Sequence, residues 1–186
     1  MREMQKDYEN FRWENKNKRG AIRMKVITIW QPWASLIACG AKEFETRGWA
    51  TSYRGPIAIH SATLSPFKAI RDVPIDAVCK MREALKERGI LPPFTNFKDL
   101  PLGHIIATGE LVGCHKIVLH GGRGLPSTAP GWLETYRGIY EPSERELLFG
   151  DWTPGRYAWE LQNVKMLDTP IPAKGKQRIW NWEESA

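Results

Sequence analysis

The stretch ITIWQPWASLIACGAKEFETRGW, residues 27–49, passes from a β-branched segment through a compact apolar one into a charged one. Lys25–Ile29 predicts a strand, because β-branched side chains pack well on a pleated surface. Pro32–Cys39 predicts a short helix, because proline suits the first helical turn and Gly40 provides a stop. The stretch therefore predicts a strand, a helix and a sharp turn before the charges begin.

The charged segment KEFETR, residues 42–47, predicts a second strand. Glu43, Glu45 and Arg47 share one face of it, because side chains alternate along a strand. In one interpretation the strand is solvated, with Lys42 and Glu43 in water and Glu45 paired with Arg47. In the other, the charges form a site set into a pocket, since clustered ionisable residues mark functional sites in some proteins.

The rest of the chain predicts more strands around one long helix. Strand patterns occupy residues 56–62, 104–118, 156–161 and 164–173, and helical spacing occupies Ile75–Arg88. Gly109 and Gly113 interrupt the longest strand pattern, which is typical of bulges and close bends in barrels.

Two further segments complete the predicted architecture. Ser143 and Glu146 predict a capping box that opens a short helix ending at Gly150, and residues 120–132 predict a loop. Short strands with glycine bends and few helices predict an α+β fold, a small mixed β-barrel with one long helix and one or two short helices at its rim.

The composition is that of one ordinary globular domain. The 186 residues are 42% hydrophobic and 26% charged. No apolar run approaches the roughly 20 residues that span a bilayer, and the N-terminus lacks the apolar middle of a signal peptide. The three cysteines lack metal-ligand spacing and fit reduced thiols. We therefore expect a cytoplasmic protein with no membrane contact, no cofactor and no metal.

Basic residues outnumber acidic ones, for a net charge of +6. Residues 1–23 carry seven Lys/Arg against four Asp/Glu, which leaves 20 basic and 17 acidic residues in 24–186. We expect residues 1–23 to be a polar N-terminal extension and residues 24–186 to be the domain. The charge permits an anionic partner such as nucleic acid without requiring one.

Several polar residues flank the predicted helix and the strands beside it. If the helix returns the charged strand alongside Lys25–Ile29, these side chains converge at one end of the barrel. The candidates are Gln31, Lys42, Glu45, Arg47, Arg54 and His60. The alternative for His60 is a core position with a satisfied hydrogen bond.

The nine tryptophans form a second group of candidates. Indoles among basic residues stack on unpaired bases, but indoles also fill cores. We expect Trp159 and Trp180 to pack in the core or at its rim, and we consider Trp30, Trp33 and Trp152 candidates for the wall of a site.

The quoted stretch resembles the activating signal cointegrator homology (ASCH) domain, whose signature is G-x-K-x-x-E-x-R. Gly40, Lys42, Glu45 and Arg47 match that signature, and the likeness extends through FGDWTPGRYAWEL and PIPAKGKQRIWNW. The resemblance implies a PUA-like barrel with a cleft beside the signature strand. It also implies a role in binding RNA or a modified nucleotide or nucleoside, and adds Arg156 to the candidates.

The resemblance leaves alternatives open. Some members are amidohydrolases that deacylate acetylcytidine with the signature lysine, a threonine three positions later and a glutamate elsewhere; other members resemble ribonucleases. In this chain the lysine is Lys42 and the threonine position is Glu45, so these two are the catalytic candidates if the protein is an enzyme. A protein-interaction module that docks a partner on tryptophans is a further alternative.

Overall fold

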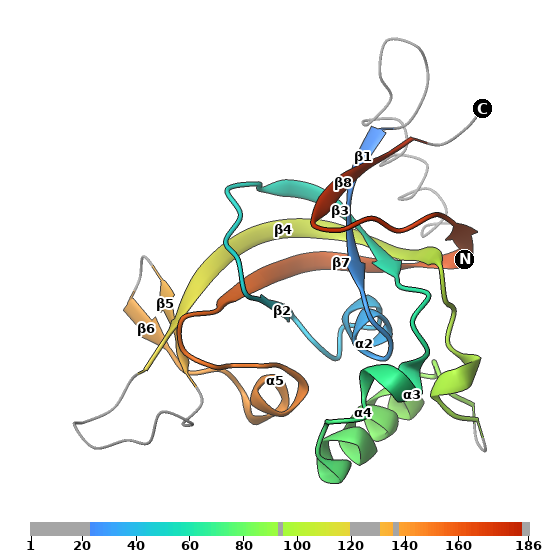
Figure 1. Ribbon diagram of the computed structural model, residues 1–186, viewed down its shortest axis with the longest axis horizontal. Helices are drawn as coiled ribbons and strands as arrows, with labels where there is room; N and C mark the ends of the chain where they lie inside the picture. The colour runs from blue at the N-terminus through green and yellow to red at the C-terminus, as the bar shows by residue number, and fades with distance from the viewer. Residues whose placement is uncertain (1–22, 93–94, 120–130, 136–137, 184–186) are drawn as a thin grey trace.

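The computed structural model describes residues 23–92, 95–119, 131–135 and 138–183 (Figure 1). In chain order the elements are β1 (Arg23–Ile29), α2 (Trp33–Ala38), β2 (Phe44–Arg47), β3 (Gly55–Ser61), α3 (Pro66–Ala69), α4 (Ile75–Glu87), the 3₁₀ turn η1 (Phe97–Asp99), β4 (His104–Val118), β5 (Trp132–Thr135), β6 (Gly138–Tyr140), α5 (Glu144–Phe149), β7 (Tyr157–Pro172) and β8 (Ile179–Glu183). The sequence-based boundaries of β1, α2, β3, β4 and α4 are confirmed to within two residues.

The strands form one curled sheet in the order β2-β7-β4-β3-β1-β8, which β5 and β6 extend from β4. Strands β1 and β3 are parallel, whereas the other pairs are antiparallel. Figure 1 shows the long strands β4 and β7 bending together, with the helices gathered below them. The predicted α+β class and barrel-like sheet are confirmed, although α3 adds a short helix to the two that the sequence predicted.

Glycines in β4 allow the sheet to curl. The pairing of β4 with β7 shifts its register between Ile105 and Ala107, across Gly109 and again just before Gly113, as expected for bulges. A Cβ at Gly109 would lie 3.1 Å from the carbonyl oxygen of Gln162. The backbones therefore approach too closely there for any larger residue to fit without a shift.

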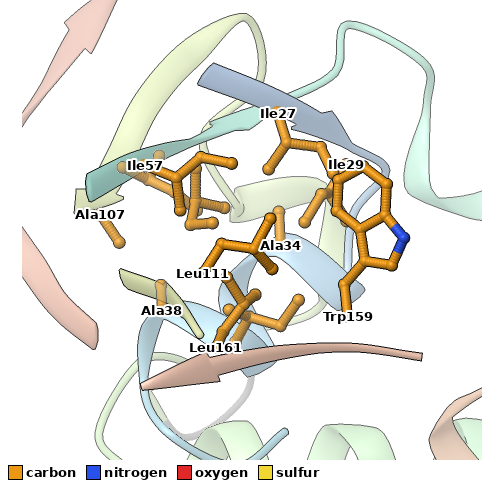
Figure 2. Close-up of a cluster of buried hydrophobic side chains, with 12 residues drawn as sticks. Ile27, Ile29, Ala34, Ala38, Ile57, Ala107, Leu111, Trp159 and Leu161 are labelled. Atoms are coloured by element: carbon orange, nitrogen blue, oxygen red, sulfur yellow. The ribbon is translucent and has the colours of Figure 1, made fainter. Parts of the chain in front are cut away.

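The main core lies between the inner face of the curled sheet and α2. It unites aliphatic side chains of β1, β3 and β4 with α2, and Trp159 of β7 packs among them with 1% of its surface exposed (Figure 2). Figure 2 shows Ile27, Ile57 and Leu111 pointing from three strands toward Ala34 of the helix. The core positions predicted for Trp159 and Trp180 are both confirmed.

Four segments differ from the sequence-based expectation or lie beyond it. The strands predicted at 156–161 and 164–173 form one continuous strand, β7 (Tyr157–Pro172), because Asn163 at φ 51° turns the chain without ending its pairing with β4. The hairpin of β5 and β6 was not predicted. The extension predicted at 1–23 and the loop predicted at 120–132 lie outside the described residues, except for Arg23, which begins β1, Gly131, which precedes β5, and Trp132, which is the first residue of β5.

No helix in the described ranges is both long and apolar enough to cross a membrane.

Candidate functional site

Gly40 determines where the charged segment enters the fold. At the end of α2 the N–H of Ala41 donates to the carbonyl of Leu36 at 2.8 Å, and the N–H of Gly40 donates to that of Ile37 at 3.0 Å. These two bonds form a Schellman motif, which requires a left-handed residue, and Gly40 has φ 71°. The reversed chain directs Lys42 inward, so its side chain does not reach water as a solvated strand would require.

Lys42 forms a buried ion pair with Glu146 of α5. Its Nζ lies 3.0 Å from Oε2 of Glu146, and the two side chains expose only 1% and 7% of their surface. The other carboxylate oxygen of Glu146 accepts the backbone N–H groups of Glu43 and Phe44. A buried pair is retained only when its remaining hydrogen-bonding atoms are satisfied, and this carboxylate meets that condition with three donors.

The short helix α5 is held so that its carboxylate can face β2. Ser143 caps the helix by accepting the N–H of Glu146 at 3.2 Å. The predicted capping box is only half formed, because the Glu146 side chain turns to Lys42 instead of its own N-terminus. Indole N–H groups of Trp152 and Trp33 donate to the carbonyls of Glu146 and Phe149, which satisfies acceptors that a helix end leaves unpaired.

Arg47 bridges β2 to β1 across the open side of the curled sheet. Its Nη2 donates to the carbonyl of Thr28 at 2.7 Å, and its Nε lies 3.0 Å from Oε1 of Glu45. The second contact is an ion pair without hydrogen-bond geometry, since this buried Nε has no hydrogen-bond acceptor in the described chain. The predicted pairing of Glu45 with Arg47 is therefore present, and it lies on the wall of a cavity rather than in open solvent.

A cleft of about 590 Å³ opens between β2, the end of β1 and α5. Its floor includes Lys42, Glu45 and Arg47, and its apolar side includes Val73 and Met81 from the α3–α4 region. Three indoles line it, those of Trp30, Trp33 and Trp49. A cavity of this size accommodates a small organic ligand, and it combines apolar surface with a few polar groups, as ligand pockets commonly do.

The three indoles differ in how much of the ring is exposed and in how the rest of the ring is held. Trp30 is 54% exposed, so its ring offers an open face at the mouth of the cleft. Trp33 is tied to α5 through its N–H. Trp49 packs edge-on against Trp159, with ring centroids 4.5 Å apart, and its carbonyl accepts the Trp159 N–H.

Arg156 lies at the edge of the cleft beside β2. Its Nε is 3.2 Å from a carboxylate oxygen of Asp151, and its Nη2 donates to the carbonyl of Thr46. Arg156 and Asp151 both line the cleft. The cations of Lys42, Arg47 and Arg156 are therefore each beside a carboxylate, so the cleft presents paired donors and acceptors rather than a surplus of positive charge.

A family comparison agrees with this geometry. The family model of the ASCH domain matches residues 27–170, which run from β1 into β7 and include the signature strand and α5. The chain belongs to the ASCH family. No curated protein matches the chain. The ASCH signature residues Gly40, Lys42, Glu45 and Arg47 are the ones that place and build the floor of the cleft.

Four residues that the sequence suggested for the ASCH cleft lie elsewhere. The Gln31 side chain is buried and bonds the carbonyl of Pro101 and the N–H of Ser35. Arg54 is exposed in the turn before β3 and bonds the carbonyls of Thr51 and Tyr53. These side chains satisfy backbone groups, which spacing along the chain does not reveal.

His60 and Trp152 are the other two, and both are buried. His60 Nε2 lies 3.0 Å from the carbonyl of Ala173, and Trp152 packs edge-on against Phe44. The core position considered as the alternative for His60 is therefore the observed one.

Sequence reasoning missed several residues that complete the ASCH cleft. Glu146, which lies 104 positions from its partner Lys42, holds that lysine at the cleft, and Asp151 and Trp49 line the cleft themselves. The Lys42 side chain is one signal that could have found Glu146, because a lysine directed into a core requires a buried carboxylate. The capping-box pattern concealed this pairing, because it assigned the Glu146 carboxylate to the N-terminus of its own helix.

We predict that Glu146→Gln destabilises the domain by about 3 to 5 kcal/mol, because it leaves the Lys42 ammonium buried without a counter-charge. The glutamine carbonyl can still accept the N–H groups of Glu43 and Phe44, so the loss reports on charge. Adding Lys42→Met should recover most of that stability. Urea unfolding of the wild type, both single variants and the double variant measures the coupling, and additive losses would contradict it.

We predict that His60 makes the domain less stable in mild acid. Burial lowers the pKa of His60, and this effect outweighs its hydrogen bond to the carbonyl of Ala173, which acts in the opposite direction. Because that carbonyl accepts from Nε2, protonation would place a second N–H at Nδ1, which has no partner in the described chain. The unfolded chain therefore binds the proton more readily, and stability falls as the pH drops below about 6.5, the ordinary histidine pKa.

The control variant is His60→Gln, whose side-chain amide N–H can still donate to the carbonyl of Ala173. Urea unfolding at pH 7.5 and at pH 5.5 should show a larger loss of stability in the wild type than in the variant. Equal losses in the two proteins would contradict the assignment of a neutral, buried His60.

Proposed function

We propose that this ASCH domain binds a base of RNA, or of a modified nucleotide or nucleoside, in the cleft beside β2. The proposal rests on one observation, a cavity of about 590 Å³ lined by three indoles and by paired charges from the signature strand. The ASCH family is generally linked to RNA binding, which supports the same class of ligand. The net charge of +6 is compatible with an anionic partner.

The chemistry of the cleft suits a flat, polar ring. Trp30 presents an exposed face on which a base can stack, and such stacking tolerates any base because each has a π-face. The carboxylates of Glu45 and Asp151 can accept from an exocyclic amine, and the guanidinium groups of Arg47 and Arg156 can donate to ring nitrogens or carbonyl oxygens. These groups are already oriented by their ion pairs, so little side-chain entropy is lost on binding.

A cleft of this kind also favours a small ligand over the interaction-module alternative. Docking of a protein partner would require a continuous apolar patch. The exposed large apolar residues of the described chain are distributed over many elements, for example Phe67 in α3, Val112 in β4 and Met166 in β7.

We predict that Trp30→Ala weakens binding of single-stranded RNA by about 1 to 3 kcal/mol, roughly five- to 150-fold in affinity, because it removes one stacking face. Stability should change little, since the ring is 54% exposed. The matched control is Tyr140→Ala on β6, an aromatic residue with 53% exposure that does not line the cleft. Fluorescence anisotropy with a labelled 12-nucleotide RNA would measure both, and equal affinities of the two variants would contradict the proposal.

A second candidate function is supported by the Lys42–Glu146 pair. The amidohydrolase alternative requires a lysine and a glutamate together, and these two side chains meet at 3.0 Å with Lys42 on the wall of the cleft. Paired with Glu146, the Lys42 side chain can donate to a carbonyl oxygen and stabilise the negative charge that develops on it during attack on an amide. Glu45 occupies the position where the resemblance gives threonine, so a hydroxyl from that position does not contribute.

We predict that, if this candidate is correct, N4-acetylcytidine is converted to cytidine by the wild type and not by Lys42→Met/Glu146→Gln. The double variant is chosen because it removes both charges together and so leaves no buried charge unpaired. Mass spectrometry of the products decides between the candidates: cytidine in excess over the protein establishes turnover, whereas intact substrate with the wild type removes the amidohydrolase candidate and leaves a binding cleft.

A further inference from the structure

The paired charges of the cleft raise the question of where a phosphate would bind. Each cation that lines the cleft lies beside a carboxylate, Lys42 by Glu146, Arg47 by Glu45 and Arg156 by Asp151. A phosphate brought to any of them would meet a like charge as well as an opposite one. The cleft is therefore suited to a base, and the phosphates of a bound strand require another surface.

Such a surface lies on the segment that joins β7 to β8. Lys174, Lys176 and Arg178 alternate along it, and all three are exposed. None of them forms an ion pair with a carboxylate in the part of the chain that the structure describes. The nearby Glu183 is engaged by Arg23 at 2.6 Å. Their positive charge is thus available to an anion.

Contacts with indoles connect this segment to the cleft. The guanidinium carbon of Arg178 lies 5.7 Å from the ring centroid of Trp49, which lines the cleft. Two residues earlier, Nζ of Lys176 lies 5.8 Å from the ring centroid of Trp180. Because two residues span at most about 7 Å, the backbone of Lys176 lies within that distance of the backbone of Arg178, whose guanidinium meets the rim of the cleft.

A second hollow lies on this segment and the start of β8. It has a volume of about 470 Å³ and is lined by Lys174, Lys176, Trp180, Asn181, Trp182 and Glu183. Trp182 is only partly buried, so part of its indole remains accessible. Cations beside accessible indoles are the combination that single-stranded nucleic acids bind, since cations follow the phosphates and indoles stack on bases.

The segment is fixed to the barrel rather than free. Strand β8 pairs with β1, and the indole N–H of Trp180 donates to the hydroxyl of Thr28 at 3.1 Å. Gly175 packs so closely on His60 that a Cβ would lie 2.5 Å from the ring carbon Cε1. Thr28 also lines the cleft and accepts from Arg47. Thr28 of β1 therefore contacts both Arg47 of the signature strand and Trp180 at the end of the basic segment, which fixes the position of one relative to the other.

We propose that Lys174, Lys176 and Arg178 form the phosphate-binding track of a single-stranded RNA whose base enters the cleft. The inference rests on the proposed function and extends it, because it favours a strand over a free nucleoside as the ligand. The RNA backbone crosses from the rim at Trp49 over Lys176 to the hollow beside Trp182, where a neighbouring base stacks.

The test uses the full chain and a fluorescein-labelled 12-nucleotide single-stranded RNA of mixed sequence. Lys174→Gln/Lys176→Gln should lower the affinity several-fold and reduce the slope of log K against log salt by about 0.7 for each phosphate that the protein no longer neutralises. Lys174→Arg/Lys176→Arg should keep both quantities at their wild-type values, which separates charge from folding. The charge-matched control is Lys86→Gln/Lys98→Gln, because these exposed lysines lie on α4 and η1 outside both hollows.

Running Trp30→Ala in the same titrations separates the two proposals. If Trp30→Ala weakens binding while the Lys174/Lys176 glutamine variant binds with wild-type affinity and salt slope, the track is overturned and the base-binding cleft stands. If the glutamine variant weakens binding but Trp30→Ala does not, RNA binds the segment without the cleft, which overturns both the proposed function and its link to the track. An equal loss in the Lys86/Lys98 control would show a general charge effect and would also overturn the track.

Discussion

The carboxylate of Glu146 is the group on which the arrangement of the site depends. It is buried, it neutralises Lys42, and it accepts backbone N–H groups at the start of β2. Without it, an ammonium would lie inside the fold uncompensated, and the first peptide groups of the signature segment would lose an acceptor. A six-residue helix distant in the sequence therefore determines how an edge strand is held. The two indoles that donate to the carbonyls of that helix hold the carboxylate in place.

Charges on this domain are divided between two environments. Within the cleft, cations and carboxylates are paired, which orients their hydrogen-bond donors and acceptors and limits the attraction for an anion. On the segment before β8, the cations are exposed and lie beside indoles. If the proposed RNA binding is correct, this division explains how a modest net charge could support it, because the position of the unpaired cations matters more than their total number.

Tryptophan has several roles in this fold, and the role depends on what surrounds each ring. Trp159 fills the core and Trp152 fixes α5, whereas Trp30 leaves more than half of its surface exposed beside the cleft. Trp49 combines two roles, because it packs on Trp159 and also meets Arg178. Residue type alone identified the indoles as important, but burial and hydrogen bonding distinguish a structural indole from one that a ligand can reach.

Local patterns in the sequence determined the elements of this protein. The β-branched run of β1, the proline and glycine that bound α2, and the glycines of β4 act through nearest-neighbour sterics and backbone freedom, which can be read in order along the chain. The same patterns carried the family resemblance and three residues of the cleft floor. Only the tertiary structure decided the partner of Lys42, the confinement of Gln31, Arg54, His60 and Trp152 to structural roles, and the meeting of Arg178 with Trp49. The reason is physical: an ion pair or a ring contact depends on distance in space, and the curl of the sheet brings together residues that the sequence separates by a hundred positions or more.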